Sequence, residues 1–126
     1  MKIRLSIFLL MTFLLPGCYN HDIGISNDIK GQWIWKSSCG GAVGCVSSSQ
    51  TNYRTLKISD TNVEIIDNGK ITFNSNYSII NTTSSDHSKL YKIEFNGGLI
   101  WTLTISNNIL STDYASVLYS VYERQK

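Results

Sequence analysis

The sequence has few of the residues on which catalysis usually depends. It contains two histidines, His21 and His87, and its two cysteines beyond residue 18 lack a second Cys/His pair at zinc-ligand spacing. Asp86, His87 and Ser88 are consecutive, whereas the members of a Ser–His–Asp triad come from separated segments of a chain. No glycine-rich loop leads into a helix that could hold a phosphate group. We therefore predict no enzyme, no metal ion and no cofactor.

Clusters of positive charge are also missing. The chain has 11 Lys and Arg residues against 9 Asp and Glu residues, which gives a formal net charge of +2. Lys2 and Arg4 account for that excess, and both lie at the very start of the chain. The remainder is formally neutral and has no basic patch, so it lacks the electrostatic footprint that nucleic-acid binding requires.

The first 17 residues are typical of an export signal. A largely apolar run from Leu5 to Leu15 follows Lys2 and Arg4, and it is too short to span a bilayer as a helix. The run ends in Leu-Pro-Gly-Cys, which resembles the bacterial lipobox, where the cysteine is acylated by chains such as palmitate and becomes the first residue. The resemblance implies a lipoprotein signal peptide at 1–17, a membrane anchor on Cys18 and a polar tether at 18–30. An ordinary signal peptide with a chance cysteine is the alternative.

Residues 31–126 are expected to form one domain, in which apolar and polar residues alternate. Asn68-Gly69 is a strong hairpin signal, because a type I′ turn needs positive φ at both central positions. No segment shows the 3.6-residue period of an amphipathic helix. We predict an all-β, eight-stranded antiparallel up-and-down barrel, an architecture that abolishes edge strands, with a β-sandwich as the alternative. The expected strands are 31–36, 53–58, 63–65, 71–79, 90–95, 99–105, 109–112 and 117–124.

The first and last expected strands carry the residues that should close the barrel. Trp33 and Trp35 share one face of the first strand, and Gly31 allows a close approach because it has no Cβ. The chain ends its last strand in Tyr122, Glu123 and Arg124. Pairing of these two strands would bring Arg124 over Trp33 as a cation–π lid. We therefore predict that Gly31, Trp33, Tyr122 and Arg124 close the barrel.

The order of these motifs resembles the lipocalin and calycin barrels, and in particular the small lipocalin-like lipoproteins of Gram-negative bacteria. The Gly31-x-Trp33 opening, the Ser/Gly-rich first loop, the Asn68-Gly69 hairpin and the closing Tyr-Glu-Arg carry the resemblance. It implies a lipocalin-like barrel in the cell envelope. Tyr19 follows Cys18 where an Asp often retains lipoproteins in the inner membrane, so the analogy favours the outer membrane, on its periplasmic or surface face.

The long loop at 37–52 contains the two remaining cysteines, Cys39 and Cys45. With Cys18 acylated and the compartment oxidising, we predict a disulfide between them. Chain-entropy arithmetic gives such a short ring about 2 kcal/mol of stabilisation. A metal site on the two thiolates is the alternative.

These observations together predict a lipid-anchored envelope protein without catalytic activity. We expect it to bind a small hydrophobic ligand at the barrel mouth, with Trp35, Tyr53 and Trp101 as the ligand-binding residues. The alternative is a protein-interaction lipoprotein, such as a lysozyme-inhibitor-like barrel, that blocks a partner with its loops. We further expect a monomer whose other partner is the membrane.

Overall fold

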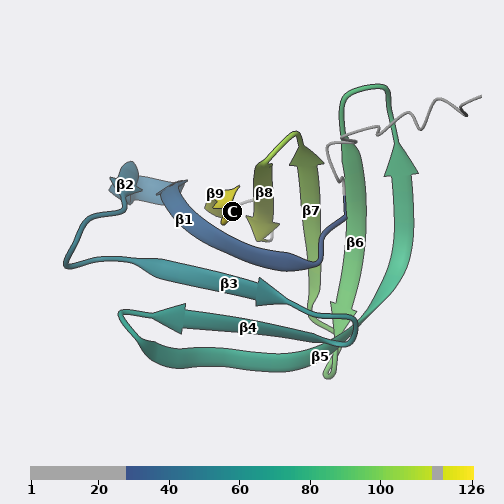
Figure 1. Cartoon of the computed structure of the whole chain (residues 1–126), viewed down its shortest axis with the longest axis horizontal. Coiled ribbons are helices and arrows are strands. Elements are labelled where there is room, and N and C mark those ends of the chain that lie inside the picture. The colour runs from purple at the N-terminus through teal and green to yellow at the C-terminus, as the bar shows by residue number, and fades with distance from the viewer. Residues whose placement is uncertain (1–27, 115–117) are drawn as a thin grey trace, which may run out of the picture.

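The computed structural model describes residues 28–114 and 118–126 (Figure 1). The predicted signal peptide, Cys18 and the tether up to residue 27 lie outside the described residues. Those described form strands joined by loops, with one short 3₁₀ helix. The elements are β1 (Gly31–Cys39), η1 (Gly41–Val43), β2 (Cys45–Ser47), β3 (Arg54–Ile58), β4 (Asn62–Asp67), β5 (Lys70–Ser84), β6 (Lys89–Phe95), β7 (Ile100–Ser106), β8 (Ile109–Tyr114) and β9 (Leu118–Arg124).

One antiparallel sheet closes on itself to form a barrel. Its strand order is β2-β1-β3-β4-β5-β6-β7-β8-β9, and β1 also pairs with β9. The closing register sets Trp33 opposite Arg124 and Trp35 opposite Tyr122. The predicted eight-stranded barrel is therefore confirmed, and the sandwich alternative is wrong because the first and last strands share one sheet. The described residues include no helix long and apolar enough to cross a membrane.

Two segments predicted as loops are strands. The stretch 81–84, rich in Thr and Ser, continues β5 and pairs with β6 as far as Ser84↔Lys89. Within the first loop, β2 pairs with the end of β1 in the register Cys39↔Cys45. In both places a nearby strand supplies the ladder, and it overrides the turn-forming preference of small polar residues.

β5 is the strand that gives the barrel its shape. It runs for 15 residues, pairing with β4 up to Asn76 and with β6 from Tyr77 onward. Its pairing register is interrupted by two bulges. One lies in the pairing with β4, between Ile65 and Ile66, and the other in the pairing with β6, between Ile79 and Asn81. Bulges bend a strand and increase its twist, and Figure 1 shows β5 turning from the β3–β4 layer toward β6 and β7.

The barrel interior is packed with large side chains. Trp33, Leu56, Ile93 and Leu103 are among the fully buried ones. Trp101 stacks on Phe73 with ring centroids 5.3 Å apart, and Phe95 meets Trp101 edge-on at 4.5 Å. Aromatic pairs in these geometries stabilise a core beyond their area burial. The bulk that the sequence places on one face of the strands therefore fills much of the interior.

The structure contains the predicted disulfide between Cys39 and Cys45, at the tip where β1 meets β2. Replacing both cysteines by alanine should lower the free energy of unfolding by about 2 kcal/mol, because the unfolded chain regains the freedom of a short ring. Urea unfolding of the variant and of the reduced parent should give the same loss. Equal stability of the oxidised parent and the double variant would contradict the expected contribution of the bridge.

Candidate functional site at the barrel mouth

We call the barrel end at Cys39, Arg54 and Asp67 the mouth, and the opposite end, at Gly31 and Arg124, the floor. The inward residues of β1 change from apolar to polar toward the mouth, from Trp33 through Trp35 to Ser38. Trp35 is buried, and its indole Nε1 donates a hydrogen bond of 2.8 Å to the Ser38 hydroxyl. The bond fixes the orientation of the indole ring just below the mouth.

Three hydroxyl groups lie together there, and we call them the hydroxyl layer: Ser38, Thr112 and Ser120. Ser38 Oγ and Ser120 Oγ are 2.6 Å apart, and Thr112 is directly opposite Ser120 on the neighbouring strand. Thr112 and Ser120 are fully buried, and Thr112 Oγ1 has no hydrogen-bond partner within the described part of the chain. The bond between the two serines uses one of their two hydroxyl protons. With the proton of Thr112, two hydroxyl protons of this layer therefore have no acceptor among the described residues. A buried polar group without a partner costs about 1–3 kcal/mol of stability. A bound ligand that supplies a hydrogen-bond acceptor would remove this cost.

An ion pair stands beside the hydroxyl layer. Arg54 holds Asp67 with two hydrogen bonds, Nε to Oδ1 at 2.5 Å and Nη2 to Oδ2 at 3.2 Å, and the Arg54 guanidinium lies 5.9 Å from the Trp35 ring. Thr72 donates a further hydrogen bond of 2.7 Å to Asp67. Both charged side chains are about seven-tenths buried, with relative exposures of 31% and 29%. The mouth therefore combines an indole face, a paired guanidinium and unused hydroxyl donors.

The surroundings of the pair shift the pKa of both groups. Partial burial acts to lower the pKa of Arg54, but hydrogen bonding with Asp67 and Tyr122 outweighs it and the net shift is upward. Burial likewise acts to raise the pKa of Asp67, and the hydrogen bonds from Arg54 and Thr72 reverse that effect and lower it. Asp67 is thus ionised at neutral pH and neutralises the guanidinium.

Because the pKa of Asp67 is lowered on folding, its ionised form stabilises the native state. The contribution is complete above the ordinary pKa of 3.8 and is lost as pH falls through the lower folded value. Asp67→Asn should cost about 1–2 kcal/mol at pH 7, since it removes a charge-assisted bidentate contact that is still partly exposed to solvent. The cost should shrink as pH falls below 3.8 and Asp67 becomes protonated. Urea unfolding across that pH range measures it, and a pH-independent difference would contradict this origin.

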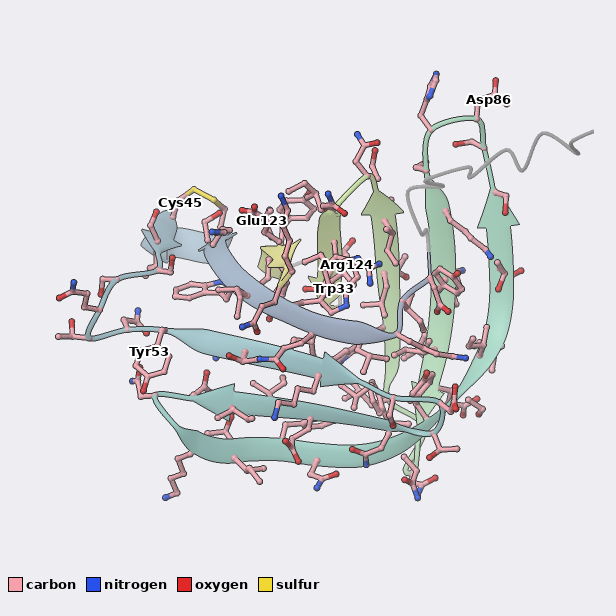
Figure 2. The ribbon with its side chains drawn as sticks, viewed as in Figure 1. Trp33, Cys45, Tyr53, Asp86, Glu123 and Arg124 are labelled. Carbon is pink, nitrogen blue, oxygen red and sulfur yellow. A yellow bond between two sulfur atoms is a disulfide. The ribbon has the colours of Figure 1, made fainter. Side chains whose placement is uncertain are left out.

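At the floor, the predicted closing residues meet as expected. The Arg124 guanidinium lies 4.2 Å from the Trp33 ring centroid and donates hydrogen bonds to the backbone carbonyls of Lys30 at 2.9 Å and Asp28 at 2.6 Å (Figure 2). The indole of Trp33 donates to the carbonyl of Ile29 at 2.9 Å. A Cβ on Gly31 would meet Arg124 Nη1 at 3.0 Å, so the glycine makes room for the lid. The floor is closed by these contacts.

The three residues predicted to bind a ligand have different surroundings. Trp35 lies next to the hydroxyl layer. Trp101 belongs to the aromatic packing with Phe73 and is almost fully buried. Tyr53 is 45% exposed at the rim, where its backbone N–H bonds the side chain of Asn68 (Figure 2). Of the three, Trp35 is the one that the structure places beside unused hydrogen-bond donors.

We did not predict most of the residues at the mouth from the sequence, although the two-residue period of the strands indicates which of them face inward. Arg54 lies two residues before Leu56, and Asp67 lies two after Ile65, so each shares the inward face of its strand. Thr112 follows Leu110 by the same interval. A polar residue at an inward position of a barrel strand is thus the sequence feature that indicates this site.

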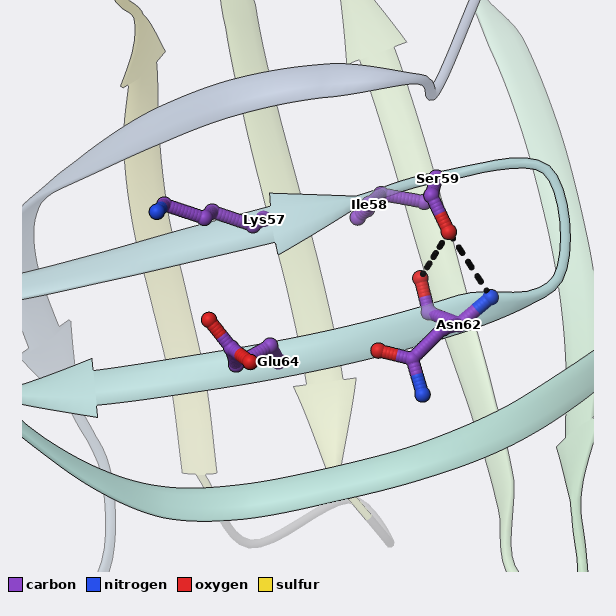
Figure 3. A pocket seen from close by; sticks show the side chains of 5 residues that line it. All are labelled: Lys57, Ile58, Ser59, Asn62 and Glu64. Carbon is purple, nitrogen blue, oxygen red and sulfur yellow. Dashed lines mark hydrogen bonds between the residues drawn. The ribbon is translucent and has the colours of Figure 1, made fainter.

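A shallow pocket of about 230 Å³ lies elsewhere, on the β3–β4 hairpin near the floor (Figure 3). Its lining is Lys57, Ile58, Ser59, Asn62 and Glu64. The Ser59 hydroxyl exchanges hydrogen bonds with the backbone of Asn62, at 3.1 and 3.3 Å, which occupies the polar groups of the turn. We assign no function to this pocket.

No group of three potential metal ligands comes together in residues 28–114 and 118–126. Comparison of the chain with family models, with curated proteins and with solved structures gave no match.

Proposed function

We propose that this chain is a lipid-anchored envelope protein that binds a small hydrophobic ligand carrying a hydrogen-bond acceptor at the barrel mouth. The observation that carries the proposal is the buried, unpartnered hydroxyl of Thr112 beside the Ser38–Ser120 pair. An acceptor on the ligand would satisfy the unused donors. Trp35 and the Arg54 guanidinium then offer an apolar face and a neutralised charge near the same point.

Anchoring rests on the resemblance of Leu-Pro-Gly-Cys18 to a lipobox and on the signal-like residues before it. Acylation of Cys18 would hold the barrel at a membrane, for which the outer membrane is the proposed location. The disulfide between Cys39 and Cys45 suits an oxidising compartment outside the cytoplasm. We propose no catalytic step for this protein, because Arg54 and Asp67 at the mouth are paired with each other.

A thermal-shift screen of the mature-length chain with Cys18→Ser tests the proposal. This protein keeps every described residue and lacks the signal-like residues 1–17 and the acylation site. Fatty acids, esters and alcohols should raise the melting temperature, since a ligand that binds only the folded state stabilises it. Hydrocarbons without an acceptor should raise it less. Absence of any shift with acceptor-bearing compounds would count against ligand binding.

A second candidate function is the blocking of a protein partner, and the exposed rim favours it. Val46 is 44% and Tyr119 49% exposed, and they lie on the strands that flank the tip of β1. The disulfide at that tip braces the hairpin, and Figure 1 shows β2 beside the end of β1, on the side of the ribbon away from β6 and β7. A rigid rim with exposed apolar side chains is suited to entering a partner's cleft. In the same screen, a shift with a lysozyme and with none of the small compounds would select this function.

A further inference from the structure

The hydroxyl layer offers two protons to a ligand. Ser38 and Ser120 share one hydrogen bond, and Thr112 Oγ1 has no partner among the described residues, so one serine proton and the proton of Thr112 are unused. A carbonyl oxygen has two lone pairs and can accept both protons. A carboxylate can accept them as well. The charge around the layer therefore decides which of these two acceptors the mouth favours.

The ion pair beside the hydroxyl layer has no net charge. Arg54 donates from Nε and Nη2 to the two carboxylate oxygens of Asp67, and Thr72 donates a third hydrogen bond to the same carboxylate. Both charged side chains are mostly buried. Asp67 thus takes the edge of the guanidinium that a carboxylate from a ligand would otherwise share.

The ion pair is close enough to the hydroxyl layer to act on a ligand there. The guanidinium of Arg54 lies 5.9 Å from the ring of Trp35, whose Nε1 donates to Ser38 at 2.8 Å. Arg54 also bonds Tyr122, which follows Ser120 by two residues on β9 and so lies on the same face of that strand. A charge placed at the hydroxyl layer would therefore interact with the pair.

The next charges along β1 and β9 lie on the outside of the barrel. Lys36 follows Trp35 and Glu123 follows Tyr122, and the two charged side chains pair with each other at 3.1 Å. Each is about half exposed to solvent. Exposed charges are screened by water and salt, so this pair does not balance a charge placed inside the mouth.

An ionised carboxylate and an uncharged carbonyl would meet different costs at the hydroxyl layer. The carboxylate would lose hydration without gaining a free cation, because Asp67 already neutralises Arg54. It would also lie near a second carboxylate, which disfavours the ionised form of both. The carbonyl of an ester carries no charge and needs only the two hydroxyl protons. The mouth is therefore better suited to the uncharged acceptor.

We propose, building on the ligand site proposed above, that the mouth selects ligands with an uncharged carbonyl, such as fatty-acid esters, over ionised fatty acids. Asp67 sets this selectivity. It acts through Arg54, whose charge it neutralises, and not by contact with the ligand. Ionised fatty acids bind at the same place, but less tightly than their esters.

The ratio of the affinities for methyl octanoate and octanoate, measured at pH 7 by isothermal titration on the mature-length chain with Cys18→Ser, tests this selectivity. This protein should bind the ester roughly tenfold or more tightly than octanoate, because burying an unbalanced charge is costly. Asp67→Asn should reduce the ratio roughly tenfold, because it leaves Arg54 free to bond the carboxylate of octanoate. Arg54→Gln should raise the ratio, because it leaves Asp67 without its cation.

The ratio separates the effect of charge from a structural effect. A general loss of structure in either variant would weaken both ligands and leave the ratio unchanged. The two variants move the ratio in opposite directions, so each tests the proposal without the other. Glu64→Gln is the matched control, since it removes a negative charge from the same strand as Asp67 at a residue that lies opposite Lys57. It should leave the ratio unchanged.

Two results would overturn the selectivity and leave the proposed ligand site standing. One is a ratio that neither Asp67→Asn nor Arg54→Gln changes. The other is a protein that, without these substitutions, binds octanoate as tightly as the ester. Binding of neither ligand by any of the proteins would instead overturn the proposed function, and the selectivity with it.

Discussion

Trp33→Ala is expected to lower the free energy of unfolding by about 3–5 kcal/mol, the range for removing a buried large aromatic side chain. Trp33 is fully buried, and its ring supports the Arg124 guanidinium 4.2 Å away. Its indole N–H also holds the carbonyl of Ile29, which is itself buried at the floor. One substitution therefore leaves a cavity, an unsupported guanidinium and an unpaired carbonyl. Urea unfolding at pH 7 measures the loss.

Tyr119→Ala is the matched control for this prediction. It removes an aromatic side chain from β9, the same strand that carries Arg124, but one that is about half exposed. Surface substitutions usually change stability by less than about 0.5 kcal/mol. A loss below about 1 kcal/mol for Trp33→Ala, or similar losses for both variants, would contradict closure of the barrel around this ring.

Cys18→Ser is expected to move the protein from the membrane fraction to the soluble fraction. If acyl chains on Cys18 hold the barrel at the membrane, the substitution removes that attachment. Fractionation of cells expressing the parent and the variant measures the shift, with radiolabelled palmitate incorporation as a direct readout of acylation. The change should be nearly complete, because acyl chains contribute about 0.8 kcal/mol for each buried methylene.

Cys45→Ser separates acylation from a general effect of losing a cysteine. It breaks the disulfide far from residue 18 in sequence and should leave the protein with the membrane. Palmitate incorporation into the Cys18→Ser variant, or its retention with membranes like the parent, would contradict the anchor.

Much of the barrel could be predicted from the period of its strands. Trp33 and Trp35 on one face, the Asn68-Gly69 turn and the final Tyr-Glu-Arg were enough to place β1 against β9. Asn68 and Gly69 both have positive φ, 49° and 81°, as the type I′ turn requires. Each of these features depends only on a few residues that are adjacent in the sequence, so it can be predicted without knowing the rest of the fold.

The extent of β5 and the site at the mouth could not be predicted in this way. Residues 81–84 form a strand because β6 pairs with them. A run of Thr and Ser does not by itself indicate that another strand will pair with it. The hydroxyl layer joins Ser38 to Ser120, which are 82 residues apart. Which inward polar residues meet depends on the closing register of β1 and β9, and that is a property of the whole sheet.

The most direct test of the proposed ligand site is the affinity of Thr112→Val for decanoic acid, measured by isothermal titration on the mature-length chain with Cys18→Ser. Valine keeps the shape of threonine and removes the unpartnered hydroxyl, so the unliganded protein should be as stable as the parent or more stable. Binding should weaken roughly fivefold, the loss of about one hydrogen bond. Thr104→Val, on β7 beside Leu103 but facing outward, should bind like the parent. Equal affinity of all three proteins, or no binding by any of them, would contradict a ligand held by the hydroxyl layer.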